Sequence, residues 1–281
     1  MASVMKMLRE EYHQKLCKQI MYVDAQGIPN NADKHSKLSV FLAKGIARRI
    51  NFPVRRKKPS GQTSGKLFEE VTEDYLKKAF RQLHHLRPGN WLFSLGKRIE
   101  DFEQYEHLAH LAETLRSHKS LRAALGDYLI HPDIVVGRMS VSDDEINRSQ
   151  ILLSDDDITA NLTSFRSENS PRPTLHASVS CKWTIRSDRA QNVRTEGLNL
   201  IRNRKGSTPH IVIVTAEPYP QRIASLALGT GDIDCVYHFA LPELQAAASE
   251  QNNPAVLDML DILVSGKRLR DISDLPFDLA I

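Results

Sequence analysis

The sequence lacks the features that hold small secreted proteins or membrane proteins together. Its 281 residues contain only three cysteines, Cys17, Cys181 and Cys235, too few and too far apart for a disulfide framework or a CxxC metal site. No segment approaches the roughly 18 consecutive apolar residues of a membrane span, and charges interrupt the apolar residues near the N-terminus that a signal peptide would need. With 41% hydrophobic and 26% charged residues, the chain has the composition of a globular protein. We expect it to be intracellular, with reduced thiols.

The sequence also has little excess charge, but that charge is unevenly distributed. The net charge is +4. Residues 44–66 carry eight basic side chains and no acid, and residues 182–205 carry seven basic side chains against two acids, a balance of +5. These segments total +13, so the rest of the chain sums to −9, including acidic runs at 143–145 and 155–157. Such segregation favours a protein that places one basic face on nucleic acid; solvated Lys/Arg-rich loops are the alternative.

Hydrophobic periodicity predicts an α/β fold with a mixed central β-sheet flanked by helices. We expect one domain over residues 1–281, mostly helical in its N-terminal half, with the sheet mainly in 131–241. Alternation in 175–185 predicts a strand that points Lys182 away from the core, and Ser187 is the expected N-cap of the next helix. The other expected strands are 131–138, 211–218 and 233–241. The expected helices are 67–86, 99–125, 187–204 and 244–264, and the expected irregular segments are 54–65 and 164–173.

Four residues next to these elements have the chemistry of a phosphodiesterase site. Asp133 follows Pro132 at the start of a short strand, Lys182 lies on the next clear strand, Glu196 lies on the helix after it, and Glu69 opens the long helix after the GQTSG loop. Carboxylates can hold Mg²⁺, which polarises a phosphate and activates water, and a lysine can orient that water. Each residue alone also fits an ordinary structural role, such as a first-turn helix acid for Glu69.

The order of these residues resembles a known signature. Pro132-Asp133, 48 intervening residues, Lys182, 13 intervening residues and Glu196 resemble the variant PD…K…E motif of type II restriction endonucleases in the PD-(D/E)XK superfamily. The usual acid two residues before the lysine is replaced here by Ser180, with Glu196 in its place, as in the branch that cleaves sites with a central CCGG. Several segments look like counterparts in an enzyme of this branch that cleaves GCCGGC: GQTSG with Phe68-Glu69, SCKWTIRSDRAQN, EGLNLIRNRKG, VTAEP, ALGTG with IDCVYHFAL, and GKRLRDISDLP.

The resemblance implies a PD-(D/E)XK restriction endonuclease-like fold and a role for each site residue. Asp133 is expected to ligate Mg²⁺ directly, together with the backbone carbonyl of Cys181, whose thiol we interpret as core. Lys182 is expected to contact the water and the phosphate. Glu196 and Glu69 are expected to complete the catalytic set, acting on the metal through bound waters.

A second group of residues is expected to read the DNA bases. Arginine can bind guanine O6 and N7 and aspartate can accept from cytosine N4, so Arg186, Asp188 and Arg189 could read C and G together. From the residues alone, a helix-stabilising aspartate between two phosphate-binding arginines is the favoured interpretation; the resemblance reverses that order and assigns them to the inner CCGG. It further implies that Asp33 and Arg222 read the outer G·C pair. By the same route Gln62 is expected to reach the minor groove.

The sequence therefore predicts a type II restriction endonuclease, a Mg²⁺-dependent enzyme that cleaves double-stranded DNA at GCCGGC and leaves 5′ overhangs. A palindromic site requires at least a homodimer, and the resemblance implies a homotetramer. It also implies a cytoplasmic prokaryotic protein and a DNA methyltransferase sharing the same target site. Two alternatives stay open at this stage: a sequence-specific DNA-binding protein without cleavage, and a repair-type nuclease of the same superfamily.

Overall fold

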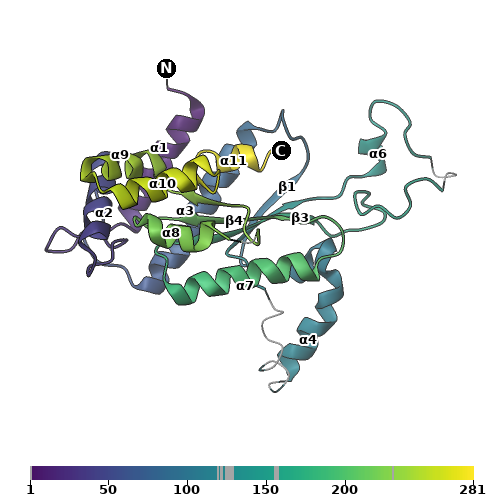
Figure 1. Ribbon diagram of the computed structural model, residues 1–281. Coiled ribbons are helices and arrows are strands. Elements are labelled where there is room, and N and C mark those ends of the chain that lie inside the picture. The colour runs from purple at the N-terminus through teal and green to yellow at the C-terminus, as the bar shows by residue number, and fades with distance from the viewer. Residues whose placement is uncertain (1, 119, 121–122, 124–129, 155–157, 230) are drawn as a thin grey trace.

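The computed structural model describes residues 2–118, 120, 123, 130–154, 158–229 and 231–281 (Figure 1). The helices in this part of the chain are α1 (Val4–Gln19), α2 (Lys37–Ile50), α3 (Gly61–Gln82), η1 (Ile99–Asp101), η2 (Glu103–Leu108), α4 (Ala109–Ser117), α6 (Asp143–Ile146), α7 (Ser187–Asn203), α8 (Pro220–Ala227), α9 (Leu241–Gln251), α10 (Pro254–Ser265) and α11 (Leu275–Asp278). The strands are β1 (Trp91–Leu95), β2 (Ile134–Arg138), β3 (Thr174–Lys182), β4 (His210–Thr215), β5 (Cys235–His238) and β6 (Leu269–Asp271).

These strands form a six-stranded mixed sheet in the order β1-β2-β3-β4-β5-β6. β1, β2 and β3 pair antiparallel, whereas β3, β4, β5 and β6 pair parallel. The parallel connections need crossovers, which α7 supplies between β3 and β4 and α8 supplies between β4 and β5. In Figure 1, α9, α10 and α11 lie on one side of the strands and α7 on the other. The expected mixed sheet with flanking helices is confirmed.

The core covers both faces of the sheet, which corrects one expectation about β3. The alternation in 175–185 predicted a solvent-facing polar side, but Ser178 and Ser180 on that side are buried, as are Ala177 and Val179 on the other. β3 is a central strand, and its polar side chains are small enough to fit under the helices. Lys182, at the end of the strand, keeps a side chain that is 20% exposed.

Two expected helix boundaries were wrong. The GQTSG segment is the first turn of α3 rather than a loop, because the Ser60 side chain caps the helix by accepting from Thr63 N at 3.1 Å. Glu69 therefore lies in the third turn instead of opening the helix. α7 does begin at Ser187, but its N-cap is Arg186, which makes no side-chain capping bond.

The expected helix over 99–125 is also corrected: its first part consists of the 3-10 segments η1 and η2, separated by Phe102 in an extended conformation. The Gln104 side chain bonds the backbone of Leu175, with its Oε1 accepting from the amide and its Nε2 donating to the carbonyl, both at 2.8 Å. These tertiary bonds leave no trace in local periodicity. Beyond α4, much of the expected helix lies outside the described residues.

The remaining elements agree in type and differ in length. β4 and β5 are shorter than the apolar runs that predicted them, and the expected helix over 244–264 is two helices, α9 and α10, separated at Asn252 in a left-handed conformation. Residues 164–173 are irregular, as expected. Strand β1, in the half expected to be mostly helical, and the short β6 were not anticipated.

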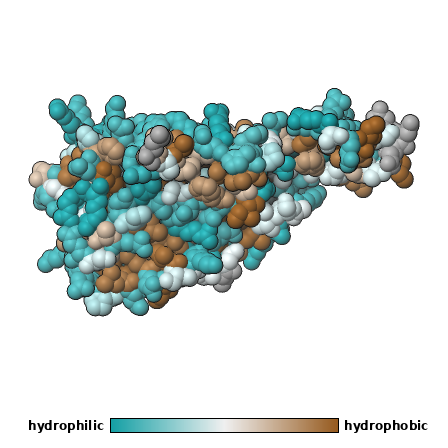
Figure 2. All heavy atoms as spheres, turned by 90° about the horizontal axis from the view of Figure 1, so that it is seen from above, coloured by the Kyte–Doolittle hydropathy of each residue, from teal (hydrophilic) through white to brown (hydrophobic). Residues whose placement is uncertain are grey.

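An arm that includes residues 139–154 and 158–173 extends away from the sheet between β2 and β3 (Figure 1). It carries α6 and exposes large apolar side chains, among them Ile151 at 84%, Ile158 at 90% and Leu162 at 98% exposure. Figure 2 shows apolar patches on the corresponding extension of the surface. The arm therefore presents several large apolar side chains to solvent.

Candidate active site and DNA cleft

Asp133 and Lys182 are brought together by the antiparallel pairing of β2 with β3. The register places Ile134 opposite Val179, so the residue before β2 lies beside the end of β3. Lys182 Nζ donates to Asp133 Oδ2 at 2.8 Å, and the backbone N–H of Cys181 donates to the same oxygen at 2.7 Å. Burial lowers the pKa of Lys182, but the adjacent Asp133 carboxylate outweighs burial and raises it above its usual value. Lys182 is therefore cationic at neutral pH.

The backbone of Lys182 is anchored on its other side by the residues that end β4. Its carbonyl oxygen accepts from Thr215 Oγ1 at 2.7 Å and from Ala216 N at 3.3 Å. The Cys181 side chain is buried in the main core cluster, in agreement with its interpretation as core, and burial raises the pKa of its thiol well above the ordinary value. The role of its carbonyl as a metal ligand stays a prediction.

Glu69 and Glu196 approach the same centre from α3 and α7. Burial, followed by the negative charge of Asp133, raises the pKa of Glu69 to about 7. Burial also raises the pKa of Glu196, against the attraction of Lys182. Both acids thus feel the charges of the Asp133–Lys182 pair, which groups all four predicted catalytic residues electrostatically.

The donor set fits a hydrated Mg²⁺. Within the described residues, no three His, Cys, Asp or Glu side chains lie close enough together to hold a metal directly. Mg²⁺ usually keeps several waters and takes only one or two protein carboxylates, so one direct ligand, Asp133, with more distant acids is a suitable arrangement. Burial is the main cause of the raised pKa of Glu69, and the charge of Asp133 adds to it, so a cation nearby would favour the ionised carboxylate.

Beside this centre lies a cleft of about 1130 Å³. Its walls come from the segment before α2, the start of α3, the chain that leaves β3, and α8; they include Asp33, Arg186 and Arg222. The carboxylate of Asp33 and the guanidinium of Arg222 form an ion pair. Three of the six predicted base-reading residues thus share one cleft, and Trp183 and Thr184 connect it to the catalytic centre along the chain.

The other three predicted base-reading residues are placed less closely. Gln62 is exposed in the first turn of α3, next to Gly61, which lines the cleft. The backbone of Asp188 and Arg189 forms the first turn of α7, but their side chains lie outside the described residues.

The basic segment 44–66 contributes less to the cleft than its charge suggested. Lys58 lines the cleft. Arg48 and Arg49 instead pair with Glu250, at 2.5 Å and 2.8 Å from their Nη2 atoms. In the segment 182–205, Arg186 and Arg194 line the cleft, and Arg194 Nη2 donates to the Ser225 carbonyl at 2.9 Å. A count of charges along the chain cannot anticipate such pairing with distant acids.

Glu217, buried behind the cleft residues Ile185 and Arg222, was missed by the sequence reasoning. Its side chain is fully buried, and burial raises its pKa to about 7. Oε2 accepts from Ile185 N at 2.9 Å, and Oε1 accepts from Tyr219 N at 3.2 Å. The available signal was an acid directly after the apolar run IVIVTA, at the carboxyl end of a parallel strand where functional groups gather.

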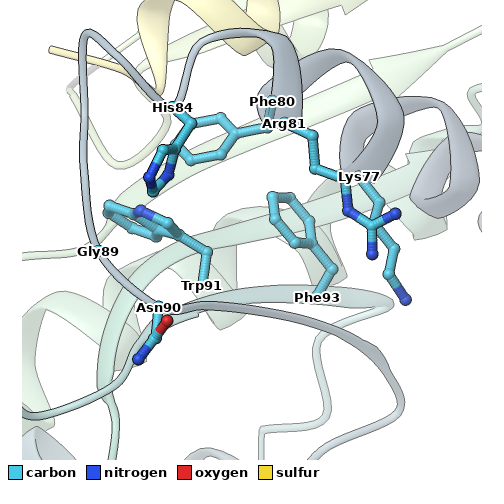
Figure 3. Close-up of a pocket in the computed structure, with 8 residues that line it drawn as sticks. All are labelled: Lys77, Phe80, Arg81, His84, Gly89, Asn90, Trp91 and Phe93. Carbon is cyan, nitrogen blue, oxygen red and sulfur yellow. The ribbon is translucent and has the colours of Figure 1, made fainter.

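A smaller hollow of about 340 Å³ lies at the far end of α3 (Figure 3). Phe80, Trp91 and Phe93 form its aromatic walls, and Lys77, Arg81 and His84 surround them. It includes none of the predicted site residues. The large cleft, by contrast, is lined by three predicted base-reading residues and by Trp183, which follows Lys182 in the chain.

The comparison with known proteins agrees with this geometry. The family model described as NgoMIV restriction enzyme matches residues 12–281. The chain belongs to the NgoMIV restriction enzyme family. It is 50% identical over 280 residues to the type II restriction enzyme NgoMIV of Neisseria gonorrhoeae, covering 97% of each chain. The expected resemblance is confirmed, and this family member is a type II restriction endonuclease.

Solved structures of Bse634I also match. A crystal structure of the type IIF restriction endonuclease Bse634I with cognate DNA is 14% identical, with 87% of this chain and 92% of that chain covered and a TM-score of 0.35. A second Bse634I structure gives a TM-score of 0.33 at 14% identity, with 79% of this chain and 80% of that chain covered.

Among the described residues of this NgoMIV family member, no helix is both long and apolar enough to cross a membrane.

Proposed function

We propose that this NgoMIV family member cleaves double-stranded DNA at GCCGGC in a Mg²⁺-dependent reaction that leaves 5′ overhangs. The observation that carries the proposal is the contact between Lys182 and Asp133 at the end of β3, four residues before Arg186 in the cleft. Cleavage and base reading are thus assigned to one continuous segment. The resemblance of the RSDR segment to the CCGG branch supports the target sequence.

In this proposal Mg²⁺ supplies a Lewis acid that polarises the scissile phosphate and lowers the pKa of a bound water. Asp133 and the Cys181 carbonyl would hold the cation, and Glu69 and Glu196 would act on it through waters. Lys182 keeps its proton on Nζ, orients the attacking water and offsets charge on the pentavalent phosphorus. Its partner Asp133 holds that ammonium group in place at 2.8 Å.

Base recognition is assigned to the six predicted base-reading residues, three of which line the cleft. Arg186, Asp188 and Arg189 would read the inner CCGG bases in the major groove, and Asp33 and Arg222 the outer G·C pair. Gln62, exposed at the start of α3, would reach the minor groove. Because Asp33 and Arg222 are already paired with each other, each restrains the other's position before DNA arrives.

The palindromic target implies that two copies act on it, so a homodimer is the minimum assembly. The arm between β2 and β3, with its exposed Ile151 and Leu162, supports a further association into the homotetramer that the resemblance implied. A methyltransferase acting on the same site would protect the host DNA in the bacterial cytoplasm, where the substrate is found.

The test is digestion of a plasmid containing GCCGGC in buffer with Mg²⁺, with a parallel reaction in excess EDTA. We expect cuts confined to GCCGGC, 5′-phosphate ends on mapping, and no cutting in EDTA. Binding without any cuts would support a non-cleaving DNA-binding protein instead. Scattered or structure-dependent cuts would support a repair-type nuclease.

A further inference from the structure

One buried carboxylate connects the two segments that carry the proposed base-reading residues. Glu217 follows β4, and its side chain is 0% exposed. Its Oε2 accepts from the amide of Ile185, the residue before Arg186, and its Oε1 accepts from the amide of Tyr219. Tyr219 is the N-cap residue of α8, the helix that carries Arg222. The same side chain therefore fixes the backbone at the start of both segments.

The connection continues through the side chain of Arg222. Its Nη1 lies 3.9 Å from Glu217 Oε2, and its guanidinium also pairs with Asp33. A carboxylate has two oxygens able to accept several hydrogen bonds, so it can hold two backbone amides and still attract a guanidinium. Ile185, Glu217, Arg222 and Asp33 form a continuous chain of polar contacts from the inner readers to the outer readers.

We propose that Glu217 is a positioning residue for specificity, which couples readout of the inner CCGG bases to readout of the outer G·C pair. This inference rests on the proposed function. Base-reading groups must be held within about 0.5 Å of their working geometry by locked supporting contacts. Glu217 supplies such a lock at two points, and it touches neither DNA nor the catalytic centre in this assignment.

The substitution Glu217→Gln tests the proposal because both carboxylate oxygens face N–H donors. Glutamine has one acceptor oxygen and one NH₂ group, so its NH₂ must oppose the amide of either Ile185 or Tyr219 and release it. Cleavage should be measured as kcat/KM on GCCGGC, on ACCGGT, which is changed at the outer pair, and on GGCGCC, which is changed at the second pair. We expect the preference for GCCGGC over one or both altered sites to fall by about tenfold or more.

Glu100→Gln is the matched control. Glu100 is also buried and also pairs with an arginine, Arg116, whose Nη2 donates to it at 2.9 Å, but within the described part of the chain its carboxylate bonds neither of the segments that carry the proposed base-reading residues. This variant should keep both preferences whatever it does to stability. A purely structural role for Glu217 would likewise lower the melting temperature without moving the ratios.

Unchanged preferences at both altered sites in a folded Glu217→Gln protein would overturn the proposal. If that variant does not fold, Glu217→Asp serves instead. Aspartate keeps the charge and both acceptor oxygens but withdraws them by one methylene, so the same fall in preference for GCCGGC is expected. Unchanged preferences in this variant would also overturn the proposal. A wild-type enzyme that cuts all three sites equally would overturn the proposed function and this inference with it. A wild-type enzyme that is specific, beside a variant that is equally specific, overturns this inference alone.

Discussion

The buried carboxyl group of Glu217 should make this protein less stable at high pH, and the size of the effect follows from its environment. Burial raises its pKa from 4.5 to about 7 in the folded state. Between those values the folded state binds the proton more tightly than the unfolded state, so the free energy of unfolding falls as pH rises. A rise of this size corresponds to about 3 kcal/mol, most of which falls between pH 5 and pH 8.

Glu217→Gln removes this titration and isolates it. The variant also loses an acceptor for one backbone amide, at a cost of about 1–3 kcal/mol, but that cost is present at both pH values and largely cancels in the comparison. Unfolding by urea at pH 5 and pH 8 should therefore show that the stability of the variant relative to the wild type rises by about 2–3 kcal/mol between the two pH values. A gain near zero would refute the argument that burial raises the pKa of Glu217.

Glu243→Gln is the control with the opposite electrostatics. Burial raises the pKa of Glu243, but hydrogen bonds from Arg9 outweigh it and lower that pKa below the usual value. A lowered carboxyl pKa contributes stability that is lost only as pH falls through the folded value, below about 4.5. The difference between this variant and the wild type should therefore be flat between pH 5 and pH 8.

Three further substitutions test the site and the fold. Lys182→Met should lower the cleavage rate by about 10²–10³-fold or more, since it removes the ammonium group at the phosphate. Fluorescence anisotropy with a labelled GCCGGC duplex in EDTA should still detect binding by this variant. Near-normal cleavage would contradict the proposed catalytic role of Lys182. Cys181→Ser should keep Mg²⁺-dependent cleavage, because only its backbone is assigned a role, and loss of cleavage with folding intact would contradict that. Gly45→Ala should destabilise α2 against α9 by about 1–3 kcal/mol in urea unfolding, since the added Cβ would lie 2.6 Å from Ala247 Cβ; Ala247→Gly in the same chain should restore stability.

The sequence predicted the elements whose signal is local. Eleven residues of alternation in 175–185 predicted β3, and the apolar run at 211–218 predicted β4, because a strand's side-chain period is a property of the strand itself. The pairing of Asp133 with Lys182 was predicted only through the family resemblance. Forty-eight residues separate the two, and no local pattern says that the start of β2 will lie beside the end of β3.

The parts that could not be predicted depend on contacts between distant segments. η1 and η2 replace a regular helix because Gln104 bonds the backbone of Leu175, and Arg49 is paired because α2 packs against α9, which carries Glu250. Glu217 fell inside the expected strand 211–218, and no local pattern assigned it a role. Its buried position depends on the tertiary fold, which brings the amides of Ile185 and Tyr219 to its two carboxylate oxygens.

The segment from Lys182 to Arg186 is held at both ends by the chain that follows β4. The Lys182 carbonyl is bound by Thr215 Oγ1 and Ala216 N, and the Ile185 amide is bound by Glu217. The consecutive residues 215–217 thus bond both the backbone of Lys182, the proposed catalytic lysine, and the backbone next to Arg186, the proposed reader of the inner bases. Only three residues separate Arg186 from Lys182, and both ends of this segment are bonded to residues 215–217. A wrong base pair that displaces Arg186 would therefore also displace Lys182. Since misplacement of about 1 Å can cost about 10²-fold in rate, this short anchored link gives the fold a direct physical route by which the identity of a base can govern cleavage.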